Sequence, residues 1–197
     1  QVVSALRIIF TIALIYFLNS GNAFSTGTLY LDQDFDNPSF PPAGWEVSNT
    51  SNYNFIRTSY TSGYGNGKAS AMADFYDYAN GSFNLITPTL PGTTAGDSPI
   101  FDHAYAPYDD GFTYYDDLEI FYYDSVDENW YSLVYYSGTE LQTANGTDQY
   151  FEPQSSEWGT KIIDIPENAT ALYFQVIEYC SNNLFIDNIF DDLRGHY

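Results

Sequence analysis

The sequence predicts an all-β fold, an antiparallel β-sandwich preceded by one apolar N-terminal helix. Short runs of aromatic and β-branched residues recur along the chain, and clusters of Gly, Pro, Asn and Asp separate them. Aromatic residues make up 19% of the 197 residues, and such residues favour half-buried strands. No helical period persists after Leu18, so a helix is expected only before that residue.

The apolar helix is expected within residues 1–23, which we separate from a β-sandwich domain spanning residues 24–197. The stretch Ile8–Leu18 is apolar except for one threonine, and an arginine precedes it. This layout is typical of a secretory signal peptide cleaved after Ala23, and it is shorter than the roughly 20 residues that span a membrane. The alternatives are a retained helix, which anchors the protein or packs inside a filament, and a fragment of unclear start.

Strands are predicted within residues 24–197 because apolar residues alternate there with a period of two. Two runs show this pattern: Leu118, Ile120 and Tyr122, and then Leu172, Phe174 and Val176. Their intervening residues are often apolar as well, which predicts central strands that are covered on both faces. No linker-like stretch divides the region, so one domain is expected.

Six runs follow one another in this domain, and the first and last are the most distinctive. The first is Phe35-Asp-Asn-Pro-Ser-Phe-Pro-Pro-Ala-Gly-Trp45, and the last is Asn183-Leu-Phe-Ile-Asp-Asn-Ile-Phe190. Between them lie residues 83–90, 101–107, 116–123 and 156–166. Their order resembles the cleaved-adhesin or choice-of-anchor J modules of Bacteroidota surface and secreted proteins, which are relatives of the MAM domain. The resemblance extends from about Leu29 to Phe190.

The resemblance implies a jelly-roll sandwich in a secreted or cell-surface protein, with a non-catalytic role in adhesion or binding. We expect a glycan or protein ligand at the cell surface. One alternative is a structural subunit of a filament or membrane-anchored assembly, packed through residues 1–23 or an edge strand. Another is a carbohydrate-binding accessory domain, with Trp45, Trp130 and Trp158 as candidates for an aromatic platform.

The charge of the chain excludes two classes of partner. Five basic residues against 26 acidic ones give a formal net charge of −21. Such a chain repels nucleic acid and anionic membrane surfaces, so membrane contact is expected only through residues 1–23 if they are retained. Divalent cations are the natural counterpart. The one cysteine, Cys180, cannot form a disulfide within the chain.

A calcium site is suggested by the run Asp32-Gln-Asp-Phe-Asp36. In a strand its three carboxylates would share one face, and oxygen ligands without His or Cys favour Ca²⁺. The resemblance implies a structural cation between the first and last strands. The matching positions are Asp34 or Asp36 and Asp187, with Asp74 as a further candidate. The alternative is a solvated acidic edge.

Catalytic motifs are weak, and we expect no enzyme activity. His103 lies in a run typical of a core strand, and no Gly-x-Ser-x-Gly nucleophile motif is present. A glycosidase needs two carboxylates that face one cleft. In a strand only Asp117 and Glu119 would share a face, so they are the one pair that we would test.

Overall fold

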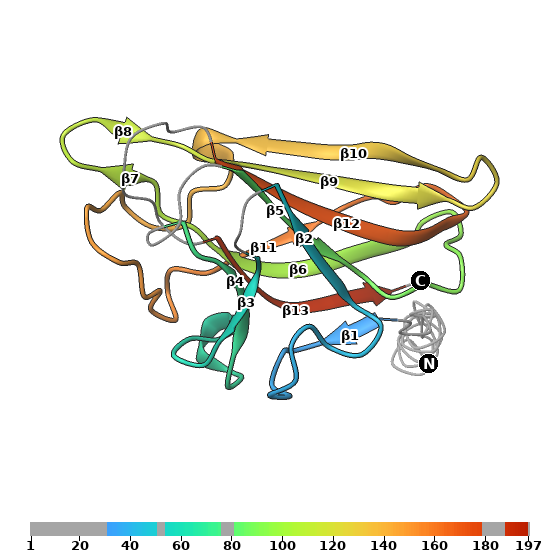
Figure 1. Ribbon diagram of the computed structural model, residues 1–197, viewed down its shortest axis with the longest axis horizontal. Helices are drawn as coiled ribbons and strands as arrows, with labels where there is room; N and C mark the ends of the chain where they lie inside the picture. Colours follow the sequence, from blue (N-terminus) through green and yellow to red (C-terminus); the bar gives the residue numbers. More distant parts are fainter. Residues whose placement is uncertain (1–30, 51–53, 76–80, 179–187, 197) are drawn as a thin grey trace, which may run out of the picture.

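The computed structural model describes residues 31–50, 54–75, 81–178 and 188–196, the last range by its backbone only. The helix predicted in residues 1–23 lies outside this part of the chain. The described residues form two antiparallel sheets, which confirms the predicted β-sandwich. Figure 1 shows the sheets stacked, with the β9–β10 turn at one end and a small hairpin projecting at the other.

The first sheet has five strands and carries the long central runs that the alternation predicts. Every neighbouring pair in it is antiparallel. In spatial order the strands are β10 (Asn129–Ser137), β9 (Asp117–Asp124), β12 (Ala169–Glu178), β5 (Gly81–Ile86) and β2 (Glu46–Asn49).

The second sheet has six strands, of which β1 (Leu31–Gln33) pairs with one end of β13. The other five, in spatial order, are β11 (Gly159–Ile162), β6 (Ser98–Ala104), β13 (Asn188–His196), β4 (Ser70–Ala73) and β3 (Ile56–Thr58). The projecting hairpin of Figure 1 is β7 (Tyr108–Asp109) with β8 (Thr113–Tyr114). Two short 3₁₀ turns, η1 (Gly63–Gly65) and η2 (Gly138–Glu140), complete the described elements.

The main core lies between the sheets and uses the alternating residues that the sequence indicates. Leu118 and Ile120 of β9 are fully buried there. Phe174 of β12 contacts Phe101 of β6 across the layers, with 5.5 Å between ring centroids. A second apolar cluster includes Met72 and Ala104 of the six-stranded sheet with Phe151 and Trp158 of the 141–158 segment.

The first predicted strand is shorter than the acidic run suggested. β1 ends at Gln33, and Phe35 adopts a left-handed backbone conformation with φ of 53°. That conformation breaks the alternation of a strand, so the expectation that Asp32, Asp34 and Asp36 share one strand face is wrong. Phe35 is instead turned into the core, where its ring packs against Trp45.

Candidate functional site

The outward face of the five-stranded sheet, which we call the outer face, is the strongest candidate for a binding site. The core residues of β9 and β12 point inward, so the positions between them face outward. Pairing aligns one outward residue from each strand into a row that crosses the sheet. This first row is Ser132, Phe121, Tyr173, Ile86 and Glu46.

Aromatic rings cluster at the β10 end of the first row. Phe121 and Tyr173 are stacked with 5.1 Å between ring centroids. Trp130, two residues before Ser132 and therefore the next outward position of β10, contacts Tyr123 at 5.3 Å and Tyr173 at 5.7 Å. The indole of Trp130 is 36% exposed. The four rings therefore form a partly exposed apolar platform on strands β10, β9 and β12.

A second row, polar in character, runs beside the first. It consists of Tyr135, Glu119, Gln175, Asn84 and Ser48. The Gln175 amide nitrogen donates to the Tyr173 hydroxyl at 2.7 Å and to the Asn84 amide oxygen at 3.1 Å. Asn84 in turn donates to Ser48 at 3.2 Å. These bonds fix polar groups of three strands next to the platform.

Two carboxylates of β9 belong to the same face, as expected for Asp117 and Glu119. The Ser132 hydroxyl donates to Glu119 at 2.6 Å, and the Tyr135 hydroxyl donates to Asp117. Both acids are thus held as hydrogen-bond acceptors by β10. Burial raises the pKa of the nearby Tyr173 hydroxyl, which remains protonated and can donate to a ligand.

A groove of about 440 Å³ opens beside Trp130, and all five strands of the sheet contribute to it. Trp130 and Tyr123 form its aromatic wall, and Glu46 supplies a carboxylate from β2. The remaining lining residues are Gly44, Ile86, Thr87, Thr89, Thr170 and Ala171. Polar and apolar groups line the groove in about equal measure, and its size is in the range of ligand sites.

Of the three tryptophans that the sequence singles out, only Trp130 belongs to this site. Trp45 and Trp158 are about 95% buried and pack in the two apolar clusters. Trp130 differs because its strand is the edge of the sheet and its register partner is Tyr123, which faces outward. The signal available in the sequence was Trp130-Tyr131 inside an uncharged nine-residue run.

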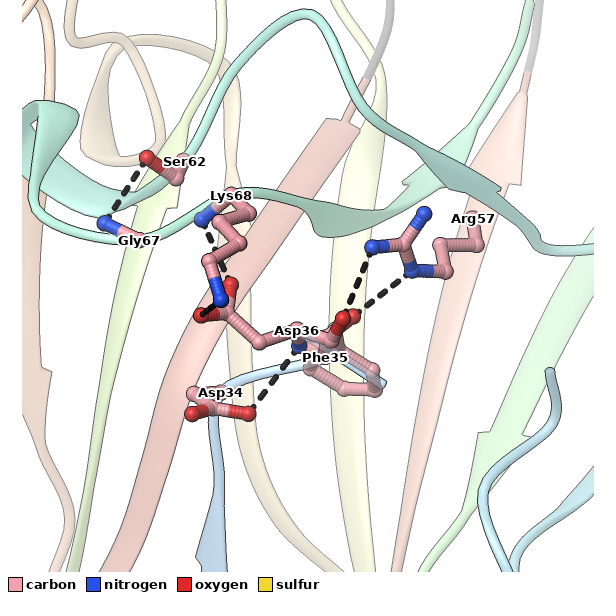
Figure 2. Close-up of polar contacts among 7 residues, drawn as sticks. All are labelled: Asp34, Phe35, Asp36, Arg57, Ser62, Gly67 and Lys68. Atoms are coloured by element: carbon pink, nitrogen blue, oxygen red, sulfur yellow. Dashed lines mark hydrogen bonds and ion pairs between the residues drawn. The ribbon is translucent and has the colours of Figure 1, made fainter. Parts of the chain in front are cut away.

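The acidic run at the start of the domain lies on the other sheet, and Figure 2 shows its contacts. The Asp34 carboxylate accepts a bond from the Asp36 backbone N–H at 3.0 Å. The Asp36 carboxylate accepts the Lys68 backbone N–H and lies 3.8 Å from the Lys68 amino group. A lysine of this chain thus supplies a positive charge at Asp36, where the sequence suggested a calcium ion.

Arg57 fastens the same turn from β3. Its guanidinium donates to the Phe35 carbonyl at 2.7 Å and to the Asp36 carbonyl at 3.0 Å (Figure 2). Because guanidinium donors are charged and arranged as a planar fork, they suit two adjacent carbonyl oxygens. The strained backbone at Phe35 is held from outside by Arg57 and from inside by core packing.

Of the other two predicted metal ligands, Asp74 lies at the far end of β4. Asp36 contacts Lys68, just before β4, whereas the buried Asp74 follows the last residue of that strand. Lys68 and Asp74 are six residues apart, which corresponds to roughly 20 Å of extended chain at about 3.3 Å per residue. Asp187 is outside the described residues. Among the residues that are described, no three His, Cys, Asp or Glu side chains come together as a metal site.

His103 is a buried core residue, as its sequence context predicts, and is 4% exposed. Its two ring nitrogens lie 3.0 Å from the Gly159 carbonyl and 3.1 Å from the Leu141 carbonyl. Burial lowers the pKa of the imidazole to about 4, and the positive charge of Lys161 acts in the same direction. The histidine is therefore neutral at pH 7 and is enclosed by the fold.

No protein-family model matches the sequence, and neither does any curated protein. Solved structures do show the fold. The K3 cleaved adhesin domain of Lys-gingipain from Porphyromonas gingivalis W83 has a TM-score of 0.57 at 16% identity, covering 86% of this chain and 100% of that domain. The K2 domain of Lys-gingipain gives 0.59 at 13% identity, covering 85% and 97%. The chain therefore has the jelly-roll fold of cleaved-adhesin domains.

A third similar structure comes from carbohydrate-binding modules of the β-sandwich superfamily. Its TM-score is 0.52 at 12% identity, and the match covers 84% of this chain and 61% of that one. At this identity the similarity concerns the fold. A shared sandwich does not by itself transfer a ligand, because function is determined by the local site.

Proposed function

We propose that the protein is a non-catalytic binding module, secreted or displayed at the cell surface, that holds a glycan on its outer face. The observation that carries this proposal is the partly exposed platform of Trp130, Tyr123, Phe121 and Tyr173 beside a bonded polar row. The sheet arranges both sets of groups before any ligand arrives, which limits the entropy cost of binding.

The chemistry of a sugar ring matches this arrangement. The C–H groups on one side of a pyranose form an apolar patch that packs against the electron-rich face of an aromatic ring. Its hydroxyls need donors and acceptors at the edge of that contact, because buried polar groups without partners are costly. Glu119 supplies an acceptor beside the rings, and the Tyr173 hydroxyl, which accepts from Gln175, supplies a donor.

The comparisons support a binding role through the fold alone. The similar structures are cleaved adhesin domains and carbohydrate-binding modules of the β-sandwich superfamily. A protein ligand and self-assembly remain alternatives. The filament alternative depends on an edge strand or on residues 1–23, which the structure does not describe. Within the described ranges, no helix is long and apolar enough to cross a membrane.

Two adjacent exposed aromatic residues allow a matched test. Trp130 lies on the outer face, whereas Tyr131 is 37% exposed and pairs with inward-facing Tyr122. Calorimetry against a panel of soluble glycans should give binding that Trp130→Ala weakens by at least about tenfold, or ~1.4 kcal/mol. Tyr131→Ala should bind as the parent protein does.

Two results would contradict the proposal. Equal losses of affinity in Trp130→Ala and Tyr131→Ala would show that the outer face is not the site, provided that circular dichroism shows both variants folded. Release of shorter sugars from a bound glycan, followed by thin-layer chromatography, would show a hydrolase and not a binding module. In that event Asp117 and Glu119 would be the carboxylates to substitute first.

A further inference from the structure

We infer that the ligand of the outer face is an extended, uncharged glycan that lies across the strands, from Trp130 on β10 toward Glu46 on β2. This inference rests on the proposed function and specifies the ligand class. It is carried by the direction of the two rows, by the composition of the groove and by the placement of the basic residues.

The direction follows from the pairing of the strands. The apolar surface does not run along one strand: Phe121, Tyr173 and Ile86 are register partners on β9, β12 and β5. The polar row continues in the same direction beside it, through Glu119 and Gln175. A ligand with an apolar side and a hydroxyl-bearing edge satisfies both rows only if its long axis crosses the strands.

The length follows from the spacing of those strands. Five strands at 4.7–4.9 Å separation make a face about 19 Å across. The groove follows this direction, with its aromatic wall at Trp130 and Tyr123 on one side of the sheet and Glu46 on the edge strand at the other. A single sugar ring would cover one end only, whereas a short oligosaccharide would reach both.

The absence of charge on the ligand is inferred from the charged residues of the outer face. Glu46, Asp117 and Glu119 are acidic positions of the outer face. None of the five basic residues of the chain lies within the residue ranges of the five strands. A uronate or sulfated glycan would find no basic residue on these five strands, and the net charge of −21 opposes its approach. Carboxylates suit the hydroxyls of neutral sugars as acceptors.

Neutral β-1,4-linked gluco-, xylo- and manno-oligosaccharides of two to six units are the probes, with oligogalacturonides of matched length as the charged counterpart. Calorimetry should show affinity rising at least about tenfold from dimer to hexamer for a neutral series. Glu46→Gln should weaken the hexamer several-fold and leave the dimer unchanged, because a dimer on the aromatic wall does not reach β2. Trp130→Ala should weaken both lengths.

The possible results distinguish a failure of this inference from a failure of the proposed glycan-binding function. Equal affinity for dimer and hexamer, or an equal effect of Glu46→Gln on both, would overturn the crossing orientation while glycan binding stands. Oligogalacturonide binding as tight as that of the neutral series would overturn the charge class in the same way. No binding of any probe, neutral or charged, would overturn both proposals.

Discussion

Trp130 on β10 packs edge-on against Tyr173 on β12, with 5.7 Å between ring centroids and 79° between ring planes, although β9 lies between the two strands. The indole reaches across the neighbouring strand and contacts Tyr123 of β9 on the way. Three strands are therefore tied together on the outer face, and the candidate binding platform is also a packed part of the sheet.

This packing predicts a measurable coupling between Trp130 and Tyr173. An edge-to-face aromatic pair contributes about 0.5–1.5 kcal/mol beyond area burial. A double-mutant cycle with Trp130→Ala and Tyr173→Ala, followed by urea unfolding, should give a coupling energy in that range. As a control, Tyr64 lies in the turn η1, outside the five-stranded sheet, so Trp130→Ala and Tyr64→Ala should be additive. A coupling near zero would show that the rings do not support one another.

The turn after β1 gives a second prediction, about Arg57. Arg57→Ala removes two charge-assisted bonds to the carbonyls of Phe35 and Asp36, each worth about 1.5–3 kcal/mol in comparable cases. We expect the free energy of unfolding to fall by about 2 kcal/mol or more, because the left-handed backbone of Phe35 loses its outer support.

Lys68→Ala is the matched control for that variant, since it removes the other cation from the same turn. The Lys68 side chain is 81% exposed, and ion pairs in water contribute about 0–1 kcal/mol. Chemical denaturation of both variants should thus separate them clearly. A larger loss for Lys68→Ala than for Arg57→Ala would mean that the charge at Asp36, and not the guanidinium bonds, holds the turn.

The sequence predicted the strands well where one set of alternating residues is strongly apolar. Leu118, Ile120, Leu172, Phe174 and Val176 are all buried in the core, because a period of two fixes which residues share a face. Alternation predicts less for β10, where Trp130 and Tyr131 are both aromatic and the register shifts between Ser132 and Val134. Only pairing with β9 decides which of the two rings faces outward.

The candidate site was harder to predict than the fold for a related reason. The rows of the outer face join residues more than a hundred positions apart in sequence, such as Glu46 and Tyr173, and these rows depend on strand order. For the acidic run at residues 32–36, by contrast, the sequence predicted an arrangement that the structure does not have. Its spacing suggested one strand face, whereas the positive φ of Phe35 ends the strand after Gln33.

The calcium hypothesis yields a third prediction, in which the structure limits the choice between the candidate ligands Asp36 and Asp74. The Lys68 amino group lies 3.8 Å from the Asp36 carboxylate and opposes a second cation there, so of these two candidates we propose Asp74 as the calcium ligand. Calcium at about 100 times its dissociation constant should raise the free energy of unfolding by roughly 2.7 kcal/mol. Thermal unfolding with calcium and with chelator measures this directly. Asp74→Asn should abolish the shift, and Asp36→Asn should retain it. Identical melting curves of the parent protein with calcium and with chelator would contradict the calcium hypothesis.

The fourth prediction concerns His103, whose ring is enclosed between the carbonyls of Gly159 and Leu141. Two carbonyl acceptors favour the doubly protonated ring, but burial opposes its charge more strongly and lowers the pKa to about 4. In the unfolded chain the imidazole should titrate near 6.5. Between these two pH values the unfolded state binds more protons than the folded state. The contribution of His103 to the free energy of unfolding is therefore fully present above about pH 6.5 and is lost as the pH drops toward 4.

The size of this pH effect follows from the difference between the pKa values of His103 in the folded and unfolded states. A separation of about 2.5 pKa units corresponds to roughly 3 kcal/mol lost between pH 7 and pH 4. Carboxylates add their own pH dependence, so the contribution of His103 is the difference between the parent protein and His103→Gln, which cannot titrate. Urea unfolding at half-unit steps of pH should show a flatter profile for the variant, whatever its absolute stability. Parallel profiles would mean that the pKa of His103 is the same in the folded protein as in the unfolded chain.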